Sequence, residues 1–136
     1  MPAPTPYLLF DRVAAEALRF YQGVFGGELV LDTFAEFGRE DGPEDAIAHG
    51  VLSGAVDLFG ADVSGDERPI RIEGVMLSLL GSATPDVLEG WFAALSDGGH
   101  VLDALQERPW GDVDGTVRDR FGVTWLLGHE GGATHP

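Results

Sequence analysis

The sequence contains no cysteine and no long hydrophobic run, and each absence excludes a class of protein. Without cysteine there is no disulfide framework, no thiolate nucleophile and no cysteine-based zinc site. No apolar run approaches the roughly 18–20 residues that a membrane-spanning helix requires. The start of the chain also lacks the basic segment of a secretory signal. We therefore expect a cytoplasmic protein that does not enter the membrane.

Positive charge is also scarce, because the 8 basic residues are all arginine and 23 residues are acidic, for a formal net charge of −15. A field of this sign repels nucleic acid and anionic membranes, so we expect neither as a partner. It attracts cationic ligands, although an acidic surface also serves solubility alone or suits a salty environment. The length of 136 residues predicts a single domain spanning 1–136, large enough to bury a core without staples.

The first half of the chain has the pattern of one helix among four strands. Apolar residues from Ala14 to Phe25 recur at the spacing of an amphipathic helix. Asp11 is expected to cap this helix and Gly26–Gly27 to end it. The acid-rich segment 36–45 is expected to be a solvated loop. Short runs of strand-forming residues predict strands at 7–10, 28–34, 46–52 and 56–60.

The second half repeats this pattern after a polar connector. Thr84 followed by Pro85 is a helix start, with a capping hydroxyl and a proline at the first helical position. Gly98–Gly99 is expected to end that helix. The closing meander is predicted to turn at Asp114–Gly115 and at Phe121–Gly122. Strands are predicted at 74–80 and 100–105, around Thr116–Val117, and at 123–127.

The two halves also match in residues. Phe20–Tyr21 corresponds to Trp91–Phe92, and Gly26–Gly27 corresponds to Gly98–Gly99, at a separation of about 72 positions. We therefore predict an α+β fold of two βαβββ modules, at about 6–61 and 73–128, joined by a linker at 62–72. Together the modules would form a curved eight-stranded mixed sheet, with the helices on its outer face and a concave face inside.

This duplicated pattern resembles the vicinal oxygen chelate superfamily, which includes glyoxalases, bleomycin-resistance proteins and extradiol dioxygenases. The resemblance covers about residues 6–128. Within the superfamily, the motifs resemble the PhnB-like branch in particular. It implies the glyoxalase/bleomycin-resistance fold, a homodimer and, in the enzymes, a divalent metal on the concave face. The residues that resemble this branch are Pro6-Tyr7-Leu8, Phe10, Glu16-Ala17, Phe20-Tyr21, Val24-Phe25-Gly26-Gly27, His49, Trp110-Gly111-Asp112, Gly115, Asp119-Arg120-Phe121-Gly122-Val123 and Trp125.

The metal ligands of these enzymes are His, Glu or Gln from the first and last strands of each module. Here the corresponding strands offer Asp57 and little else, and Leu126 stands where the resemblance would place a ligand carboxylate. Glu73, His129 and Glu130 lie outside the predicted strands and could be ligands only if the strand boundaries were wrong by two or more residues. We predict no metal site and no cofactor, with a divalent metal as the alternative.

His49 is the best candidate for a catalytic or polar ligand contact, because it matches the PhnB-like pattern and histidine is a common general base and polar contact. The alternative is a sheet histidine bonded to the backbone. Phe59 and Leu126 occupy equivalent places in the two halves and would make a concave cavity apolar. Trp110 would either wall that cavity or contact a dimer partner.

Arg118 and Asp119 form a charged corner, for which we expect structural pairing, with binding of an anionic group as the alternative. Trp125 is expected to be a core residue. The predicted ligand-binding residues are thus His49, Phe59, Trp110, Arg118 and Leu126.

Three functions remain open at this point. The first is metal-independent binding of a small hydrophobic or cationic molecule in the concave cavity. The second is a metal-dependent enzyme of the glyoxalase or dioxygenase kind with atypical ligands. The third is a non-catalytic dimeric interaction module. The sequence has no glycine-rich nucleotide loop after its first strand, and so does not support a doubly wound cofactor site.

Overall fold

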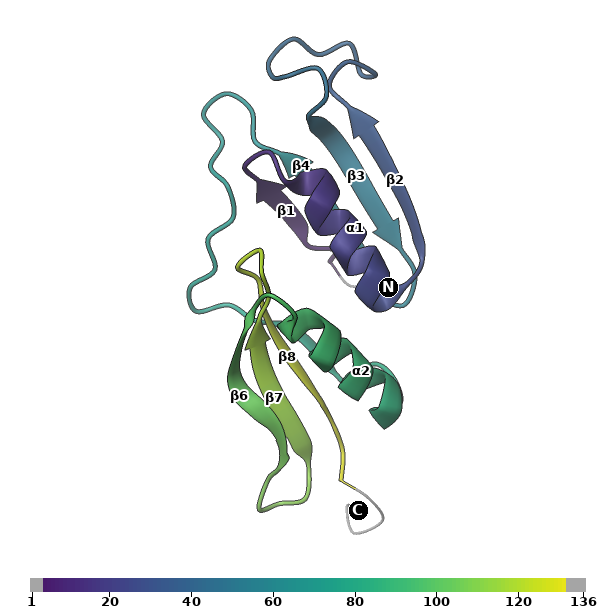
Figure 1. Ribbon diagram of the computed structural model, residues 1–136, viewed down its shortest axis with the longest axis vertical. Helices are drawn as coiled ribbons and strands as arrows, with labels where there is room; N and C mark the ends of the chain where they lie inside the picture. The colour runs from purple at the N-terminus through teal and green to yellow at the C-terminus, as the bar shows by residue number, and fades with distance from the viewer. Residues whose placement is uncertain (1–3, 132–136) are drawn as a thin grey trace. The chain divides into compact units, whose positions relative to one another are not determined.

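The computed structural model describes residues 4–131 and contains two helices and eight strands in two four-stranded sheets (Figure 1). Within this part of the chain, two compact units divide between Ile70 and Arg71. Each unit has the order β-α-β-β-β, which confirms the predicted α+β class and the duplicated module. None of the helices in the described residues is long and apolar enough to cross a membrane.

The first unit forms a mixed sheet of order β1-β4-β3-β2, in which β1 and β4 are parallel and the other pairs are antiparallel. Helix α1 contacts β2, β3 and β4. A Cβ placed on Gly50 or Gly60 would meet the side chain of Leu18, which identifies the face that the helix covers. The elements are β1 (Tyr7–Phe10), α1 (Ala14–Phe25), β2 (Glu28–Thr33), β3 (Ile47–Ser53) and β4 (Leu58–Asp62).

The second unit repeats the topology, with sheet order β5-β8-β7-β6 and β5 parallel to β8. Helix α2 contacts β6, β7 and β8. Trp125 and Leu127 are buried on β8, whereas Leu126 between them is only half-buried. The elements are β5 (Leu77–Leu80), α2 (Pro85–Ser96), β6 (His100–Glu107), β7 (Val113–Arg118) and β8 (Thr124–His129).

The cap predicted for the first helix is wrong. The N-cap residue of α1 is Val13, and its side chain makes no capping bond. The N–H of Ala14 instead donates to Asp62 Oδ1 at 3.0 Å, from a residue at the end of β4. A carboxylate distant in sequence thus replaces Asp11. The second helix does begin at Thr84 and Pro85 as predicted, but the Thr84 hydroxyl makes no capping bond.

The turn predicted at Asp114–Gly115 is also wrong, because both residues lie within β7. The connection from β6 to β7 is closed earlier, by a bond of 2.7 Å from Arg108 N to Asp112 O. Gly115 is needed for a different reason: a Cβ there would lie 2.7 Å from Leu105 N on β6. The glycine permits close approach of two strand backbones rather than a tight turn.

The final turn is confirmed, with Gly122 at φ 87° and a bond of 2.9 Å from Asp119 N to Val123 O. Several strand boundaries differ from the prediction; β4, for example, spans Leu58–Asp62 rather than 56–60. Strand β5 begins at Leu77 rather than 74, and β8 extends to His129 rather than ending at 127.

Candidate functional site

Three aromatic rings gather on the face of the first sheet that α1 does not cover. Tyr7 and Phe59 are register partners on the parallel strands β1 and β4, with ring centroids 6.0 Å apart. The ring of His49 on β3 lies 5.6 Å from that of Tyr7 and 5.7 Å from that of Phe59. We call Tyr7, His49 and Phe59 the ring cluster. It provides an apolar surface that bears two polar groups.

A hydrogen bond of 2.9 Å joins the Tyr7 hydroxyl to His49 Nδ1. The pKa of Tyr7 is raised, first by burial and then by the negative charge of Glu67, with Arg39 opposing. The protonated hydroxyl donates to Nδ1 in one tautomer of the neutral His49 ring and accepts from Nδ1–H in the other. The sequence identified His49 but not this partner.

A bulge in β3 brings Ala48 to this face of the sheet. Asp32 of β2 pairs with His49 and Thr33 with Ile47, so Ala48 has no partner in the β2 register. The extra residue bends the strand and re-aims the neighbouring side chains. Ala48 accordingly lines the pocket described next, beside residues of β1 and β4.

The pocket has a volume of about 340 Å³ and lies within the first unit. Its apolar lining comes from short or flat side chains, and Tyr7 connects it to the ring cluster. Its polar lining comes from two loop residues, Arg39 and Glu67, and from Asp62. A volume of this size falls at the lower end of the range for small-molecule sites, roughly 300–1,000 Å³. The lining residues are Tyr7, Leu9, Arg39, Ala48, Ala61, Asp62 and Glu67.

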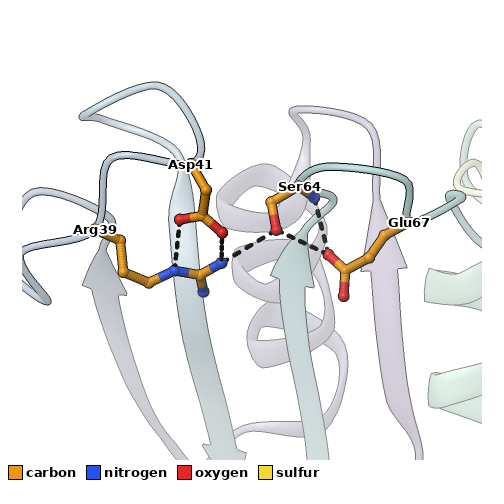
Figure 2. A network of polar contacts seen from close by, with 4 residues as sticks. All are labelled: Arg39, Asp41, Ser64 and Glu67. Carbon is orange, nitrogen blue, oxygen red and sulfur yellow. Dashed lines mark hydrogen bonds and ion pairs between the residues drawn. The ribbon is translucent and has the colours of Figure 1, made fainter.

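Arg39 and Glu67 are held in place by a polar network that joins two loops, as Figure 2 shows. Arg39 binds the Asp41 carboxylate through Nε and Nη2, and this partner lowers the pKa of Asp41. Arg39 Nη2 also donates to Ser64 Oγ at 3.1 Å. Ser64 in turn donates from its N–H and its hydroxyl to Glu67 Oε1, at 2.8 and 3.2 Å. The Arg39 guanidinium lies 4.4 Å above the Phe34 ring, which fixes it further.

Asp62 has a structural role at the edge of the pocket. It is 4% exposed, and its two oxygens accept from Ala14 N at 3.0 Å and from Ile47 N at 2.9 Å. One carboxylate thus ties the start of α1 and the start of β3 to the end of β4. Its hydrogen-bonding capacity is largely used, but its negative charge remains beside the pocket.

Two of the five predicted ligand-binding residues, His49 and Phe59, come together in the ring cluster. The other three belong to the second unit. Trp110 is 64% exposed in the β6–β7 connection, and Arg118 is exposed at the end of β7. Leu126 pairs with Ser78 as Phe59 pairs with Tyr7, so the predicted equivalence of the two positions is present in the register.

Of the two residues of the charged corner, Asp119 has a structural role. This residue is buried, and its carboxylate accepts from Phe121 N, Val123 N and the indole of Trp125. Trp125 is 1% exposed, as expected for a core residue. Arg118 forms no such pair among the described residues; the neighbouring Arg120 bonds to Asp97 instead.

The described residues do not fit the divalent ion that the resemblance implies. Within residues 4–131, no three His, Asp or Glu side chains converge as such an ion requires. Asp57 accepts from Gly54 N in the β3–β4 turn, and Glu73 pairs with Arg71 on the surface. His129 does lie on β8, contrary to the prediction, but its Nδ1 faces the carbonyl of Glu130 at 3.0 Å.

Three residues that line the pocket, Tyr7, Arg39 and Glu67, are not among those predicted from the sequence. Arg39 carried one signal, because it is the single basic residue of the acid-rich segment 36–45. Tyr7 carried another, as the only polar side chain of its strand. Nothing in the sequence indicated that the loops bearing Arg39 and Glu67 meet.

Comparisons with known proteins agree with this architecture. A family model for the Glyoxalase/Bleomycin resistance protein/Dioxygenase superfamily matches residues 5–127. An uncharacterised protein of Mycobacterium bovis is 32% identical over 134 residues, covering 93% of this chain and 82% of its own. The crystal structure of protein PA1353 from Pseudomonas aeruginosa has a TM-score of 0.76 and 30% identity, covering 96% of this chain and 98% of that one.

A PhnB protein from Bacillus cereus shares the fold, with a TM-score of 0.77 and 23% identity, covering 94% of this chain and 99% of that chain. The resemblance predicted from the motifs is therefore confirmed, including the PhnB-like neighbourhood in fold. This chain belongs to the Glyoxalase/Bleomycin resistance protein/Dioxygenase superfamily.

Proposed function

We propose that this protein binds a small molecule with an apolar or aromatic body and a positive charge, on the open face of the first sheet and without a metal. The observation that carries the proposal is a pocket of about 340 Å³ that shares Tyr7 with the ring cluster. Flat rings and small aliphatic side chains suit an apolar body. The family hosts many unrelated chemistries, so the argument rests on the site rather than on the fold.

The preference for a cation follows from the charges around the pocket. Arg39 forms its salt bridge with Asp41, and Glu67, which is near enough to attract Arg39, forms no salt bridge among the described residues. Asp62 adds a further negative charge. The faces of Tyr7 and Phe59 also attract a cation through their ring quadrupoles. A positively charged guest therefore gains from both the carboxylates and the rings.

An NMR titration of the ¹⁵N-labelled chain with benzylamine, and separately with benzyl alcohol, tests this function. The two molecules differ mainly in charge. We expect benzylamine to shift the amide signals of Tyr7, His49 and Phe59, and benzyl alcohol to bind at least several-fold more weakly. Equal binding of both, or shifts confined to the second unit, would contradict the proposal.

Metal independence has its own test. Melting of the chelator-treated protein is followed by thermal shift with Zn²⁺, Mn²⁺ or Ni²⁺ added in turn. We expect no stoichiometric rise in melting temperature and unchanged benzylamine binding. An ion that binds one per chain and sharply raises the melting temperature would instead favour the metal-dependent enzyme of this superfamily.

We also propose a homodimer in the cytoplasm. Apolar side chains on the edge strand β6 are unusually open, with Val101 49% and Leu102 52% exposed. An edge strand with exposed apolar residues is usually covered in a folded protein. Light scattering should give twice the chain mass, and Leu102→Asp should lower it toward one chain. A monomer at micromolar concentration would contradict this part of the proposal, and cell fractionation tests the compartment.

A further inference from the structure

The two carboxylate oxygens of Glu67 have different surroundings. Its Oε1 accepts both the N–H and the hydroxyl of Ser64, which fixes the side chain in one orientation. Its Oε2 has no hydrogen-bond partner among the described residues. Figure 2 shows this oxygen on the strand side of the network, away from the loop tips. Because Glu67 lines the pocket, it offers one fixed, charged acceptor to a guest.

The guanidinium nitrogens of Arg39 also differ in their surroundings. Nε and Nη2 are bound to Asp41 and Ser64, whereas Nη1 has no hydrogen-bond partner in the described part of the chain. In Figure 2, Nη1 points the same way as the free oxygen of Glu67. A single hydroxyl, that of Ser64, separates the two charged groups. The pocket therefore presents a donor and an acceptor side by side, both held in place by other bonds.

The charges decide which chemical groups these atoms favour. Glu67 and Asp62 line the pocket beside Arg39, which is already paired with Asp41, so the net negative charge favours an ammonium group. Arg39 is compensated by Asp41, and Glu67 and Asp62 line the same pocket, so a carboxylate would be repelled there. A neutral carbonyl oxygen accepts from Arg39 Nη1 without that repulsion.

We propose that the ligand of this pocket is a primary amine that also carries a neutral carbonyl oxygen within a few bonds of the nitrogen. The ammonium lies against Glu67 Oε2, the carbonyl oxygen accepts from Arg39 Nη1, and the apolar body lies along Leu9 and Tyr7. This inference rests on the proposed function and narrows it from organic cations in general to amino amides and amino ketones.

Calorimetry with three matched probes at neutral pH tests the ligand class. N-(2-aminoethyl)benzamide has the ring, the amine and the carbonyl; 4-phenylbutylamine lacks the carbonyl; N-ethylbenzamide lacks the amine. We expect the first to bind roughly tenfold more tightly than either of the others, since one hydrogen bond to a charged group supplies about that factor. Equal affinity of the first two probes would overturn the inference.

Two variants assign the groups. Glu67→Gln keeps an oxygen acceptor for Ser64 and removes the charge, while Glu44→Gln makes the same change on an exposed residue outside the pocket lining. We expect Glu67→Gln to weaken both amine probes roughly tenfold and Glu44→Gln to weaken them less than twofold. Equal effects of the two would show a general field rather than a site.

Arg39→Lys keeps a positive charge but loses the forked donor. We expect it to abolish the advantage that the carbonyl gives, so that N-(2-aminoethyl)benzamide and 4-phenylbutylamine bind alike, with the circular dichroism spectrum unchanged. A carbonyl advantage that survives Arg39→Lys would overturn the assignment to Arg39. If the probes bind without any preference for amine plus carbonyl, only this inference fails. If benzylamine and all three probes fail to bind, the proposed function fails with it.

Discussion

The two units share a frame but differ on the face that their helices leave open. Superposing their sheet registers pairs the ring cluster with residues of quite different chemistry. The second unit has no ring at these positions, and the aspartate among them is committed to an ion pair with Arg108 at 2.7 Å. The equivalent pairs are Tyr7 with Ser78, His49 with Asp114, and Phe59 with Leu126.

Two helix-facing pairs on the same strands have stayed apolar in both units. Leu8 and Leu79 are both buried, as are Leu58 and Trp125. A residue under a helix must fill a closely packed space, so its volume and polarity are constrained. A residue on the open face has no such constraint and can acquire a specific chemistry. Pockets occupy equivalent places on the two open faces, with volumes of about 340 Å³ in the first unit and about 240 Å³ in the second, and the ring cluster beside the first favours a site there.

The two units also differ in the first residue of each helix and in the strand residue that would bond to it. Ala14 has an N–H that Asp62 accepts, whereas the equivalent residue of α2 is Pro85, which has no N–H to satisfy. The position equivalent to Asp62 is His129, and its Nε2 is buried without a hydrogen-bond partner among the described residues. The second unit has therefore lost both halves of this contact.

This difference gives the largest predicted effect. Asp62→Ala leaves the N–H groups of Ala14 and Ile47 without their partner, so we expect a loss of about 3 kcal/mol in the free energy of unfolding. His129→Leu removes an unpaired buried nitrogen and should change that free energy by less than about 1 kcal/mol. Urea unfolding monitored by circular dichroism measures both. Equal losses would show that the two positions still share a role.

Gly50 and Gly115 are equivalent in the two sheet registers, but their surroundings differ. A Cβ at Gly115 would lie 2.7 Å from backbone nitrogen on β6, whereas one at Gly50 would lie 2.5 Å from the end of the Leu18 side chain. Because a side chain yields more easily than a strand, Gly115→Ala should cost about 2–3 kcal/mol and Gly50→Ala about 1 kcal/mol. Thermal unfolding of both variants provides the measurement, and the reverse order would contradict it.

The open faces are compared by truncating their equivalent residues. Phe59→Ala removes a ring that contacts both Tyr7 and His49, so benzylamine binding should weaken about tenfold. Leu126→Ala should weaken it less than about twofold, since it changes the second unit. NMR titration of the two variants decides the point. A larger effect at Leu126 would move the site to the second unit, where Trp110 and Arg118 are the other predicted contacts.

The smallest effect concerns the phenol of Tyr7, which is replaced by an aliphatic hydroxyl at the equivalent Ser78. The pKa of Tyr7 is raised above its ordinary value of 10.0, so the folded state binds its proton more tightly than the unfolded state does. The stability associated with this proton is complete below pH 10.0 and is lost as the pH rises through the folded-state pKa. Tyr7→Phe should lack this part of the alkaline loss. Urea midpoints measured on both sides of that pH for the two proteins test it; parallel curves would rule out a contribution from Tyr7.

Sequence reasoning succeeded where local rules govern. The stripe from Ala14 to Phe25, the start at Thr84–Pro85 and the turn at Phe121–Gly122 depend on spacing, on a fixed proline φ and on a glycine at positive φ. The motifs also identified the superfamily and two members of the ring cluster, His49 and Phe59. The helix, its proline start and the turn can each be recognised from a few neighbouring residues, whereas the superfamily and Phe59 follow from the pattern repeated along the chain.

It failed where a partner lies far along the chain. The cap on α1 comes from Asp62, 48 residues after Ala14. A glycine is required at position 115 because the backbone of β6 lies too close for a Cβ, and not because of a local turn. The pairing of Arg39 with Ser64 spans 25 residues and depends on which two loops meet at the end of one sheet.

The sequence by itself determined the duplicated βαβββ pattern, the faces that must be buried and the excess of negative charge, because these follow from local periodicity and composition. Only the tertiary structure decided that Tyr7 is bonded to His49, and that Arg39 and Glu67 each have one polar atom beside a pocket without a hydrogen-bond partner in residues 4–131. Strand register and loop contacts are set by the packing of the whole unit, and no short stretch of residues encodes them.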